Sequence, residues 1–273
     1  MEVAKNQAQE LPMNLVKLVK LLVVIPTYNE IDSIASLTSQ VLSMPENVDI
    51  LIVDDNSPDG TARLVKEIAR AWPDRVKLIE RTKKTGLGGA YRTGFSWFLT
   101  QPQYTHLVTM DADHSHRPQD LATMIALLTS SNSSKMPGAD VIMGVRWMPG
   151  GAIVNWPKSR QRLSRMGTSY ARWALKLPLR DLTGGFRIYS RTLLEKIRIQ
   201  SVSSEGYCFQ IEMARAACAA QALILESPIT FVERTSGVSK MSRGIVIEAL
   251  FKVTRWALDS RFKPNADKLH YVK

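Results

Sequence analysis

Apolar runs and helical patterns alternate along the first half of the chain. Each run has the length and the branched apolar residues typical of a buried strand, and each pattern places apolar residues three or four positions apart. This order predicts an α/β fold with a wound, mostly parallel sheet and right-handed crossovers. The predicted strands are 21–25, 48–53, 76–79, 106–110 and 139–145. The predicted helices are 32–43, 61–71, 90–99 and 119–129, and the predicted loops are 81–89 and 130–138.

The alternation weakens after residue 145. The pattern there predicts helices at 156–177 and 204–220 and extended segments at 184–190 and 229–233. A final helix at 248–262 is predicted to be amphipathic. No apolar stretch reaches the roughly 18 residues of a membrane span, so we expect no transmembrane segment.

Polar segments follow three of the predicted strands. Asp111-Ala112-Asp113 follows one strand, Asp54-Asp55 follows a second, and Pro26-Thr27-Tyr28-Asn29-Glu30 follows a third. Parallel strands end at one edge of a sheet, where α/β proteins bind their ligands. The two carboxylates of Asp111 and Asp113 predict a site for a hard divalent cation that also takes up substrate phosphates. Such a triplet is also common in solvated loops, but the other two segments favour the metal.

Two of these segments are candidates for binding a nucleotide. Tyr28 offers an aromatic surface for a base and Glu30 an acceptor for base or sugar donors, although an ordinary turn before the next helix is the alternative. Asp54 and Asp55 are candidate acceptors for a base or ribose, and the alternative is helix N-capping at Asn56 or Ser57. The glycine-rich loop 83–89 lacks the Walker spacing, so its glycines are expected to let a helix pack tightly.

Positive charge is concentrated in the second half of the chain. Residues 1–142 carry 14 Lys and Arg against 16 Asp and Glu, and residues 143–273 carry 22 against 9, for a total of +11. The asymmetry predicts an anionic partner (nucleic acid, a membrane surface or phosphates) or a solvated basic face. The candidate anion-binding residues are Arg146, the pair Arg160 and Ser164 one helical turn apart, and Arg234 and Lys240 in a loop.

The two cysteines and the N-terminus bear on the compartment. Cys208 and Cys218 stand in apolar surroundings and are too few for a disulfide framework. Residues 1–11 include acids and lack the pattern of a signal peptide. We therefore expect buried, inert thiols and a cytoplasmic protein.

Five motifs occur in order between residues 21 and 262. They are VIPTYNE at 24–30, VDDNSPDGT at 53–61, MDADHSH at 110–116, DLTGGFR at 181–187 and GYCFQIE at 206–212. Together they resemble the family 2 glycosyltransferases, and more narrowly the dolichyl- or polyprenyl-phosphate mannosyltransferases. The stretch 228–240, with its Ser-Lys-Met-Ser run, is most similar to actinobacterial polyprenyl-monophosphomannose synthases.

The resemblance implies a GT-A fold, a Rossmann-like wound sheet, over residues 21–232. Residues 1–20 would form an N-terminal tail, and residues 233–273 an acceptor loop and a membrane-proximal amphipathic helix. The implied reaction moves mannose from GDP-mannose to a polyprenyl phosphate, with Mg²⁺ or Mn²⁺ and with inversion at the sugar carbon. The product would be β-mannosyl-phosphoryl-polyprenol, a lipid-linked mannose donor for glycoconjugate and glycoprotein synthesis.

The resemblance also assigns roles by matching position. Asp111 and Asp113 would be the catalytic pair that binds metal and diphosphate. Ser115 would be a further metal ligand, at a position where some relatives have glutamine. The nucleotide sugar would contact Pro26, Tyr28, Glu30, Val53, Asp55, Ala112, Arg234 and Lys240. The acceptor phosphate would contact Arg146, Arg160 and Ser164.

This chemistry needs no strong base. A phosphate with a second pKa of roughly 6 is already ionised at neutral pH and attacks directly. A metal would act as a Lewis acid on the leaving diphosphate, and cations would bring two anionic substrates together. His114 and His116 are therefore expected to be either supporting residues beside the acids or solvated loop residues.

The last predicted helix is a candidate for contact with a membrane surface. Lys252 and Arg255 lie among its apolar residues, and Arg261 and Lys263 follow, which suits an interfacial helix on an anionic leaflet. The alternative is a helix packed on the catalytic core. We expect a peripheral protein on the cytoplasmic, inner face of the cell membrane, with a membrane-protein partner as a further expectation.

Three other functions are alternatives. A polyprenyl-phosphate glucosyltransferase that uses UDP-glucose would keep the fold and change only the donor. A Mg²⁺-binding regulatory module would use acids at strand ends but needs no basic second half. A nucleic-acid-binding protein would leave Asp111 and Asp113 without a role, so we expect no nucleic-acid partner.

Overall fold

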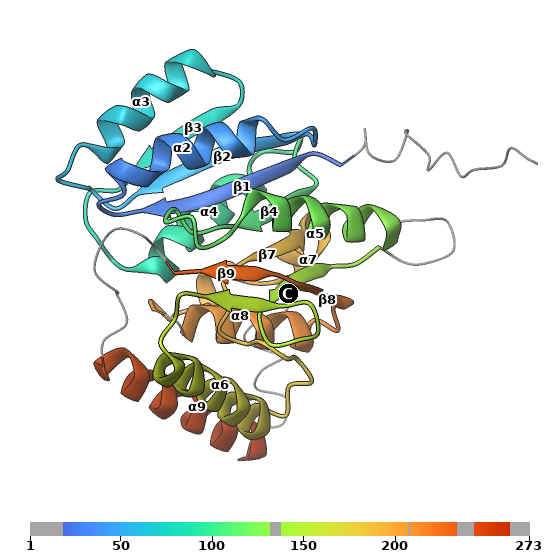
Figure 1. Cartoon of the computed structure of the whole chain (residues 1–273). Helices are drawn as coiled ribbons and strands as arrows, with labels where there is room; N and C mark the ends of the chain where they lie inside the picture. Colours follow the sequence, from blue (N-terminus) through green and yellow to red (C-terminus); the bar gives the residue numbers. More distant parts are fainter. Residues whose placement is uncertain (1–18, 132–137, 207, 234–242, 263–273) are drawn as a thin grey trace, which may run out of the picture.

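Seven strands form one sheet in the order β3-β2-β1-β4-β7-β5-β8 (Figure 1). The computed structural model describes residues 19–131, 138–206, 208–233 and 243–262. A second sheet contains two short parallel strands, β6 and β9. The strands are β1 (Leu21–Thr27), β2 (Val48–Asp54), β3 (Val76–Glu80), β4 (His106–Thr109), β5 (Val141–Val145), β6 (Ala152–Val154), β7 (Arg187–Ser190), β8 (Ile224–Pro228) and β9 (Thr230–Val232).

Strand β7 runs antiparallel to both of its neighbours, β4 and β5. The other described pairs of the large sheet are parallel, so the predicted mostly parallel sheet is confirmed with β7 as the exception. A long excursion between β5 and β7 lets the chain re-enter the sheet from the opposite end. As a result, the segment before β7 lies at the edge where β4 and β5 end.

Helices cover both faces of the large sheet. Successive residues of a strand point to opposite faces, so β1 contributes Leu22 and Val24 to one core cluster and Val23 and Ile25 to the other. Burial on both faces explains the continuous apolar runs of these strands. The helices are α2 (Ile31–Leu42), α3 (Thr61–Ala71), α4 (Leu87–Leu99), α5 (Pro118–Ser131), α6 (Lys158–Leu175), α7 (Arg191–Lys196), α8 (Cys208–Ala219) and α9 (Arg243–Phe262), with a 3₁₀ helix η1 (Ile199–Ser201).

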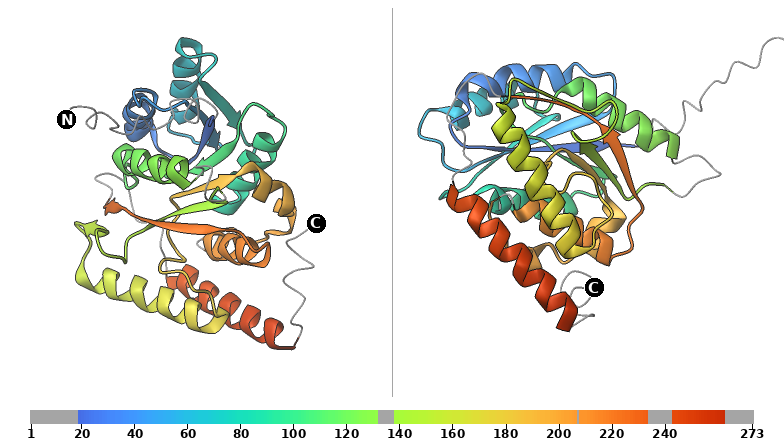
Figure 2. Two further views of the ribbon diagram at one scale, coloured as in Figure 1. Left: turned by 90° about the vertical axis from the view of Figure 1, so that its right-hand side faces the viewer. Right: turned by 60° about the horizontal axis from the view of Figure 1, so that its bottom comes forward.

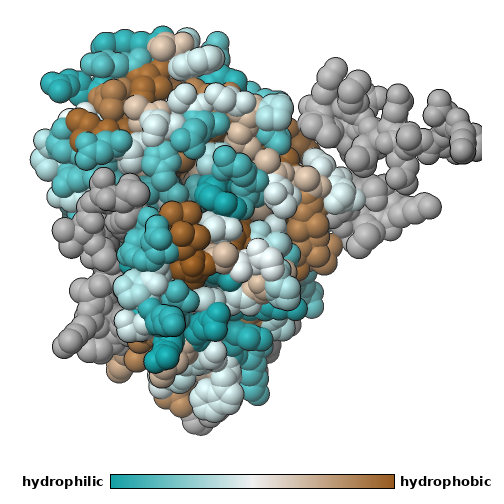
Figure 3. All heavy atoms as spheres, viewed as in Figure 1, coloured by the Kyte–Doolittle hydropathy of each residue, from teal (hydrophilic) through white to brown (hydrophobic). Residues whose placement is uncertain are grey.

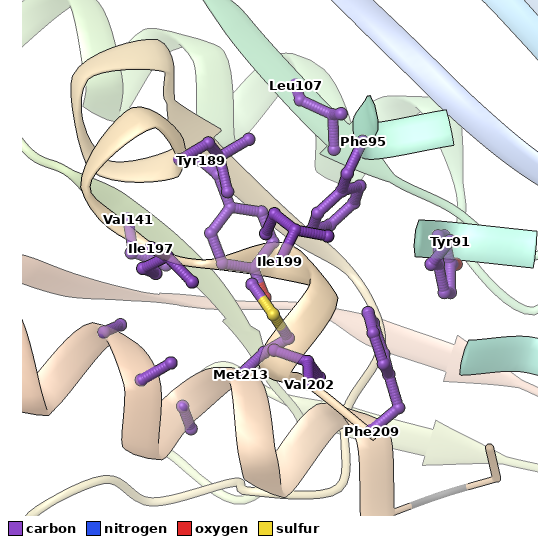
Figure 4. Packing of buried hydrophobic residues seen from close by; sticks show 14 of the residues in the cluster. Tyr91, Phe95, Leu107, Val141, Tyr189, Ile197, Ile199, Val202, Phe209 and Met213 are labelled. Carbon is purple, nitrogen blue, oxygen red and sulfur yellow. The ribbon is translucent and has the colours of Figure 1, made fainter. Parts of the chain in front are cut away.

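Aromatic rings fill the core between α4, α8 and β7 (Figure 4). The rings of Tyr91 and Phe209 stack with their centroids 5.5 Å apart. The ring of Phe95 meets Phe209 and Tyr189 edge-on, with centroid distances of 6.1 and 5.7 Å. Contacts of this geometry stabilise a core beyond the effect of the buried area, and they fix α4 and α8 against the antiparallel strand.

Helix α4 begins at Leu87, three residues before its predicted start, so part of the predicted loop is its first turn. A Cβ atom on Gly88 would lie 2.0 Å from the carbonyl oxygen of Ser204. The backbone N–H of Gly88 also donates to the carbonyl of Glu205 at 2.8 Å. Only glycine permits this approach, which confirms that glycine in the loop serves close packing.

Four short elements, β6, β8, α7 and η1, have no counterpart in the prediction. Strand β6 and helix η1 have three residues each, too few for a periodic pattern. Strand β8 lies at the edge of the sheet and contains Glu226 and Pro228, which interrupt its apolar run. The final helix begins at Arg243, five residues before the predicted start.

Helices α6 and α9 lie side by side at one end of the molecule, in all the views of Figures 1 and 2. A hydrogen bond of 2.6 Å between the hydroxyls of Tyr170 and Thr254 joins them. The predicted amphipathic division of the last helix is not confirmed, because Val253 is buried while Phe251 and Leu258 are exposed. Among the described residues, no helix combines the length and the hydropathy that a membrane span requires.

One buried histidine in β4 makes the stability depend on pH. Burial lowers the pKa of His106 from the ordinary 6.5 to about 4, against the attraction of Asp140. Between these values the unfolded chain binds a proton that the folded chain does not, so stability falls as the pH falls. We expect His106 to cost about 2 kcal/mol of unfolding free energy between pH 7 and pH 5. Urea unfolding at both pH values should show a smaller loss for His106→Gln than for the wild type, and equal losses would contradict this.

Candidate active site

The predicted metal pair lies just beyond the end of β4, and both carboxylates line one cavity. The backbone N–H and the hydroxyl of Ser115 donate to Oδ1 of Asp113 at 3.1 and 2.6 Å. The candidate ligands of Asp111, Asp113 and Ser115 are all oxygen atoms, which suit Mg²⁺ or Mn²⁺. The described residues contain no group of three or more His, Cys, Asp or Glu side chains with metal-site geometry. A metal held by this pair would therefore take further ligands from phosphate oxygens and water.

Two buried side chains, His116 and Tyr91, lie beside Asp111. Its backbone N–H donates to Nδ1 of His116 at 3.0 Å, so the neutral ring carries its proton on Nε2. The His116 ring stacks on Phe186 with centroids 4.6 Å apart, and burial lowers its pKa against the opposing charges of Asp111 and Asp113. Burial, and then the Asp111 charge, raise the pKa of Tyr91 well above its ordinary value. His116 is thus a neutral supporting residue, as one of the two expectations had it.

His114, unlike His116, makes its side-chain contact at an exposed position. Its Nε2 lies 2.7 Å from the hydroxyl of Ser36 at an exposed position on α2. Its backbone has a φ of 60°, a conformation that few residues other than glycine adopt readily. The left-handed turn at His114 carries the chain from Asp113 back to the buried Ser115.

Most of the predicted nucleotide contacts gather where β1 and β2 end. The backbone N–H of Asp55 donates to the carbonyl of Thr27 at 3.0 Å, and this bond holds the two strand ends together. The next residue, Tyr28, and Glu30 follow β1 directly, and Pro26 lies within it. This group does not contribute to the lining of the cavity that holds the acids.

Asp54 has a structural role, but the predicted alternative of helix N-capping at Asn56 or Ser57 is not found, because α3 begins at Thr61 with Gly60 at its N-cap. Its carboxylate accepts hydrogen bonds from the hydroxyl of Thr27 at 2.7 Å and from the backbone N–H and hydroxyl of Ser57 at 2.8 and 2.6 Å. It is completely buried. The side chains of Val53 and Ala112 are also buried in the core, so contact with a nucleotide could come only through their backbones.

The sequence analysis did not predict two cations beside this group, Arg81 and Lys84. Arg81 pairs with Asp55, Nη1 to Oδ1 at 2.7 Å, and also donates to the hydroxyl of Thr85. Burial still raises the pKa of Asp55 above its ordinary value, although Arg81 opposes the shift. The Nζ of Lys84 stands 3.6 Å from the centroid of the Tyr28 ring, within cation–π range. One sequence feature could have indicated Arg81 and Lys84. Both follow β3, and β3 ends at the same edge of the sheet as β2.

Arg146 lies at the end of β5 and is almost completely buried. Its Nε and Nη2 donate to the two carboxylate oxygens of Asp181 at 2.7 and 2.9 Å, and Nη2 also donates to the hydroxyl of Thr183 at 2.8 Å. Burial favours the neutral form of Asp181, but the charge and hydrogen bonds of Arg146 outweigh it and lower its pKa. Asp181 belongs to a motif of the family resemblance, but no sequence pattern predicted its pairing with Arg146.

The other two predicted acceptor residues lie on the first turns of α6. The guanidinium of Arg160 stacks over the ring of Trp156 at 4.0 Å and donates to the carboxylate of Glu233. Ser164 follows one turn later. The indole Nε1 of Trp156 is buried and finds no hydrogen-bond partner among the described residues. A buried donor of this kind is costly unless a ligand or water satisfies it.

A cavity of about 140 Å³ joins these parts. It brings together the predicted metal ligands Asp111, Asp113 and Ser115 and the predicted acceptor residues Arg146, Arg160 and Ser164. It continues between α6 and α9. The predicted donor contacts Arg234 and Lys240, and Arg261 and Lys263 at the C-terminus, fall on positions whose side chains lie outside the described part of the chain.

Comparison with known sequences identifies the family. The sequence model described as "Glycosyl transferase family 2" matches residues 22–198. The polyprenol monophosphomannose synthase of Mycolicibacterium smegmatis is 45% identical over 240 residues, which are 88% of this chain and 88% of that protein. The undecaprenyl-phosphate mannosyltransferase of Micrococcus luteus is 43% identical over 244 residues, which are 89% of this chain and 96% of that protein.

A solved structure shows the same architecture. The glucosyl-3-phosphoglycerate synthase of Mycobacterium tuberculosis, in complex with Mn²⁺, UDP and glucosyl-3-phosphoglycerate, aligns with a TM-score of 0.59. The alignment covers 90% of this chain and 82% of that one at 16% identity. At this identity the likeness concerns the fold alone, and it confirms the GT-A architecture. With the sequence matches, it shows that the chain belongs to glycosyl transferase family 2.

Proposed function

We propose that this chain transfers mannose from GDP-mannose to a polyprenyl phosphate with inversion at the sugar carbon. The product is β-mannosyl-phosphoryl-polyprenol, a lipid-linked mannose donor for glycoconjugate and glycoprotein synthesis, and GDP leaves. The names of the two relatives support the sugar and the acceptor class. The observation that carries the proposal is the single cavity that joins the acidic pair to Arg146, Arg160 and Ser164.

Asp111 and Asp113 hold the metal in this proposal, with Ser115 beside them. Their oxygen donors fit Mg²⁺ or Mn²⁺, and the structural neighbour was solved with Mn²⁺ and UDP bound. When bound, the metal supplies Lewis-acid stabilisation of the leaving diphosphate. His116 holds the backbone of Asp111 from the buried side through its Nδ1, and Tyr91 lies close enough for the Asp111 charge to raise its pKa. His116 is no candidate for a general base, because its Nδ1 accepts the hydrogen bond from Asp111 and its Nε2 carries the proton.

Arg146, Arg160 and Ser164 hold the acceptor phosphate. A guanidinium recognises phosphate through paired N–H donors, and the buried indole N–H of Trp156 offers another donor in the same cavity. The ionised phosphate oxygen attacks the sugar carbon on the side opposite the diphosphate, forming one C–O bond as the other breaks. Positioning of two anions by fixed cations supplies the rate enhancement that a base would otherwise provide.

The donor nucleotide lies where β1, β2 and β3 end. Tyr28 provides an aromatic face, and Glu30 and Asp55 accept hydrogen bonds from the base and ribose, with Pro26 beside them. Val53 and Ala112 contribute through their backbones, and Arg234 and Lys240 hold the diphosphate. Arg81 and Lys84 add positive charge at this edge of the sheet.

The reaction takes place at the cytoplasmic surface of the membrane. Met166 and Trp173 on α6 and Phe251 on α9 expose 69%, 72% and 69% of their surface, which is unusual for residues of this size. Figure 3 shows hydrophobic patches among hydrophilic surface at this end of the molecule. Exposed Arg162, Arg165 and Arg172 lie on the same helix, and basic side chains beside apolar ones suit an anionic leaflet. A membrane-protein partner at this surface is part of the proposal.

Replacing Asp113 by alanine tests the role of the acidic pair. Loss of a metal ligand should lower kcat for mannosyl transfer by about 10²–10⁴-fold, because a metal contributes several kcal/mol to charge stabilisation. Steady-state kinetics measure this, with Asp74→Ala, an exposed acid in a distant turn, as the matched control. Near-native turnover of a folded Asp113→Ala protein would rule out the assigned role.

Transfer of radiolabelled sugar to decaprenyl phosphate tests the donor and the acceptor together. GDP-mannose and UDP-glucose are compared, each with Mg²⁺, with Mn²⁺ or with a chelator. We expect a lipid product from GDP-mannose that disappears with the chelator. A product from UDP-glucose alone would leave the proposed mechanism standing and show that the transferred sugar is glucose.

Replacing Tyr28 by alanine tests the nucleotide site. Loss of an aromatic face under a base typically costs about 1–3 kcal/mol, so KM for GDP-mannose should rise roughly 5–150-fold while KM for the lipid stays constant. Trp72→Ala, which removes an exposed aromatic ring elsewhere, is the control. An unchanged KM for GDP-mannose would exclude a contact between Tyr28 and the base.

A further inference from the structure

Gly167 lies in the middle of α6 without a packing reason for being glycine. Glycine inside a helix is less stable than alanine, because its backbone loses more conformational freedom. A Cβ atom on Gly167 would meet no atom of the described residues within 4 Å. The helical glycines Gly88 and Gly94 are different, because a Cβ there would lie 2.0 and 2.5 Å from neighbouring atoms. As far as the described residues show, the space beside Gly167 is open, and an explanation for the glycine has to come from that space.

The open space belongs to the cavity of the candidate active site, which Gly167 lines. Arg160, Ser164, Gly167 and Ala171 follow each other at intervals of four, three and four residues, so they form one face of α6. All four line the cavity. The facing wall consists of Ala249, Leu250 and Val253 on α9, with Ile211 of α8.

The lining changes from charged to apolar along this face. At one end stand the acids, Arg146, Arg160 and the buried, unpartnered indole N–H of Trp156. From Gly167 onward the lining on α6 and α9 consists of Tyr170 and aliphatic side chains. A ligand that satisfies both ends carries an anionic head and an apolar chain, and Gly167 stands one turn beyond Ser164, where the chain begins.

The cavity reaches the surface beside apolar side chains. Leu163 and Leu250 line it, and each exposes more than two fifths of its surface. One turn beyond Gly167, the hydrogen bond between Tyr170 and Thr254 joins the two helices. The groove beside Gly167 therefore lies between the phosphate-binding end and a bridge that links α6 to α9.

We infer that Gly167 is a specificity-determining residue that keeps this groove open for the first isoprene units of the acceptor. The inference rests on the proposed function, which supplies the polyprenyl phosphate. A larger side chain at residue 167 would occupy the space of the chain and leave the phosphate and donor sites intact. Since a Cβ there would meet no atom of the described residues within 4 Å, the first atom of the new side chain has room beside α6.

Direct labelling tests the inference without relying on turnover. The probe is farnesyl phosphate with a photoreactive diazirine on its first isoprene unit, applied to the full chain and mapped by peptide mass spectrometry. We expect labelled peptides from α6 and α9 in the wild type and at least about tenfold less label in Gly167→Leu. Ser169→Leu adds the same side chain at an exposed position of α6 outside the cavity and should label like the wild type.

Turnover and stability complete the test. For Gly167→Leu, kcat/KM with decaprenyl phosphate should fall by about tenfold or more, with unchanged binding of a fluorescent GDP analogue. For Gly167→Ala, the midpoint of thermal unfolding should rise. Alanine has the higher helix propensity, and no contact is lost.

The two proposals fail in different ways. A wild type that labels in the groove but transfers no sugar would defeat the proposed function and leave the groove in place. Equal labelling of Gly167→Leu and wild type, label outside α6 and α9, or no label in the wild type would overturn the inference. Transfer by Gly167→Leu at the wild-type rate would overturn it as well.

Discussion

The buried ion pair between Arg146 and Asp181 is the interaction on which the candidate site depends. Removing one partner of such a pair typically costs about 3–5 kcal/mol, because the other charge stays buried alone. The pair exists because β7 runs antiparallel, so that the segment before it arrives at the edge where β5 ends. The reversed strand thus places a fixed cation in the cavity that Asp111 and Asp113 line, which an all-parallel sheet with the same strand order would not do.

The electrostatics of the site follow from bringing two anions together. Arg146 and Arg160 each have a carboxylate partner, Asp181 and Glu233, so the cations are oriented before a substrate arrives. A guanidinium has five N–H donors, more than one carboxylate accepts, and a phosphate can join the network without displacing the partner. The neutral His116 adds no competing charge beside the acids, which agrees with a nucleophile that is ionised before it binds.

The sequence predicted the parts of the fold that repeat a simple period. The strands at 21–25 and 48–53 and the polar segments after them were predictable, because burial on both faces requires continuous apolar runs. The direction of β7, the edge strand β8 and the pairing of Arg146 with Asp181 were not predictable. They depend on how distant segments meet, and no local period records that.

The site residues divide in the same way. Some could be predicted from neighbouring residues in the chain, and others depend on contacts between distant segments. Only one residue separates Asp111 from Asp113 in the chain, so the sequence alone indicates a metal-binding pair. Arg81 meets Asp55 only because β3 pairs with β2, and Gly167 in the sequence is merely an unfavourable helix residue. The proposed role of Gly167 depends on the open space beside it. That space exists only once α6 and α9 have packed together.

Helix α6 connects the proposed chemistry to the proposed membrane surface along a single axis. Eleven residues separate Arg160 from Ala171, a rise of about 16 Å, and along that length the cavity face changes from charged to apolar while the outer face exposes Met166 and Trp173. A lipid phosphate can then reach the acids while its chain remains beside the bilayer, so it need not leave the membrane entirely. A short groove for the first units, with the rest of the chain left in lipid, fits a lining that becomes apolar beyond Ser164 and reaches the surface beside Leu163 and Leu250.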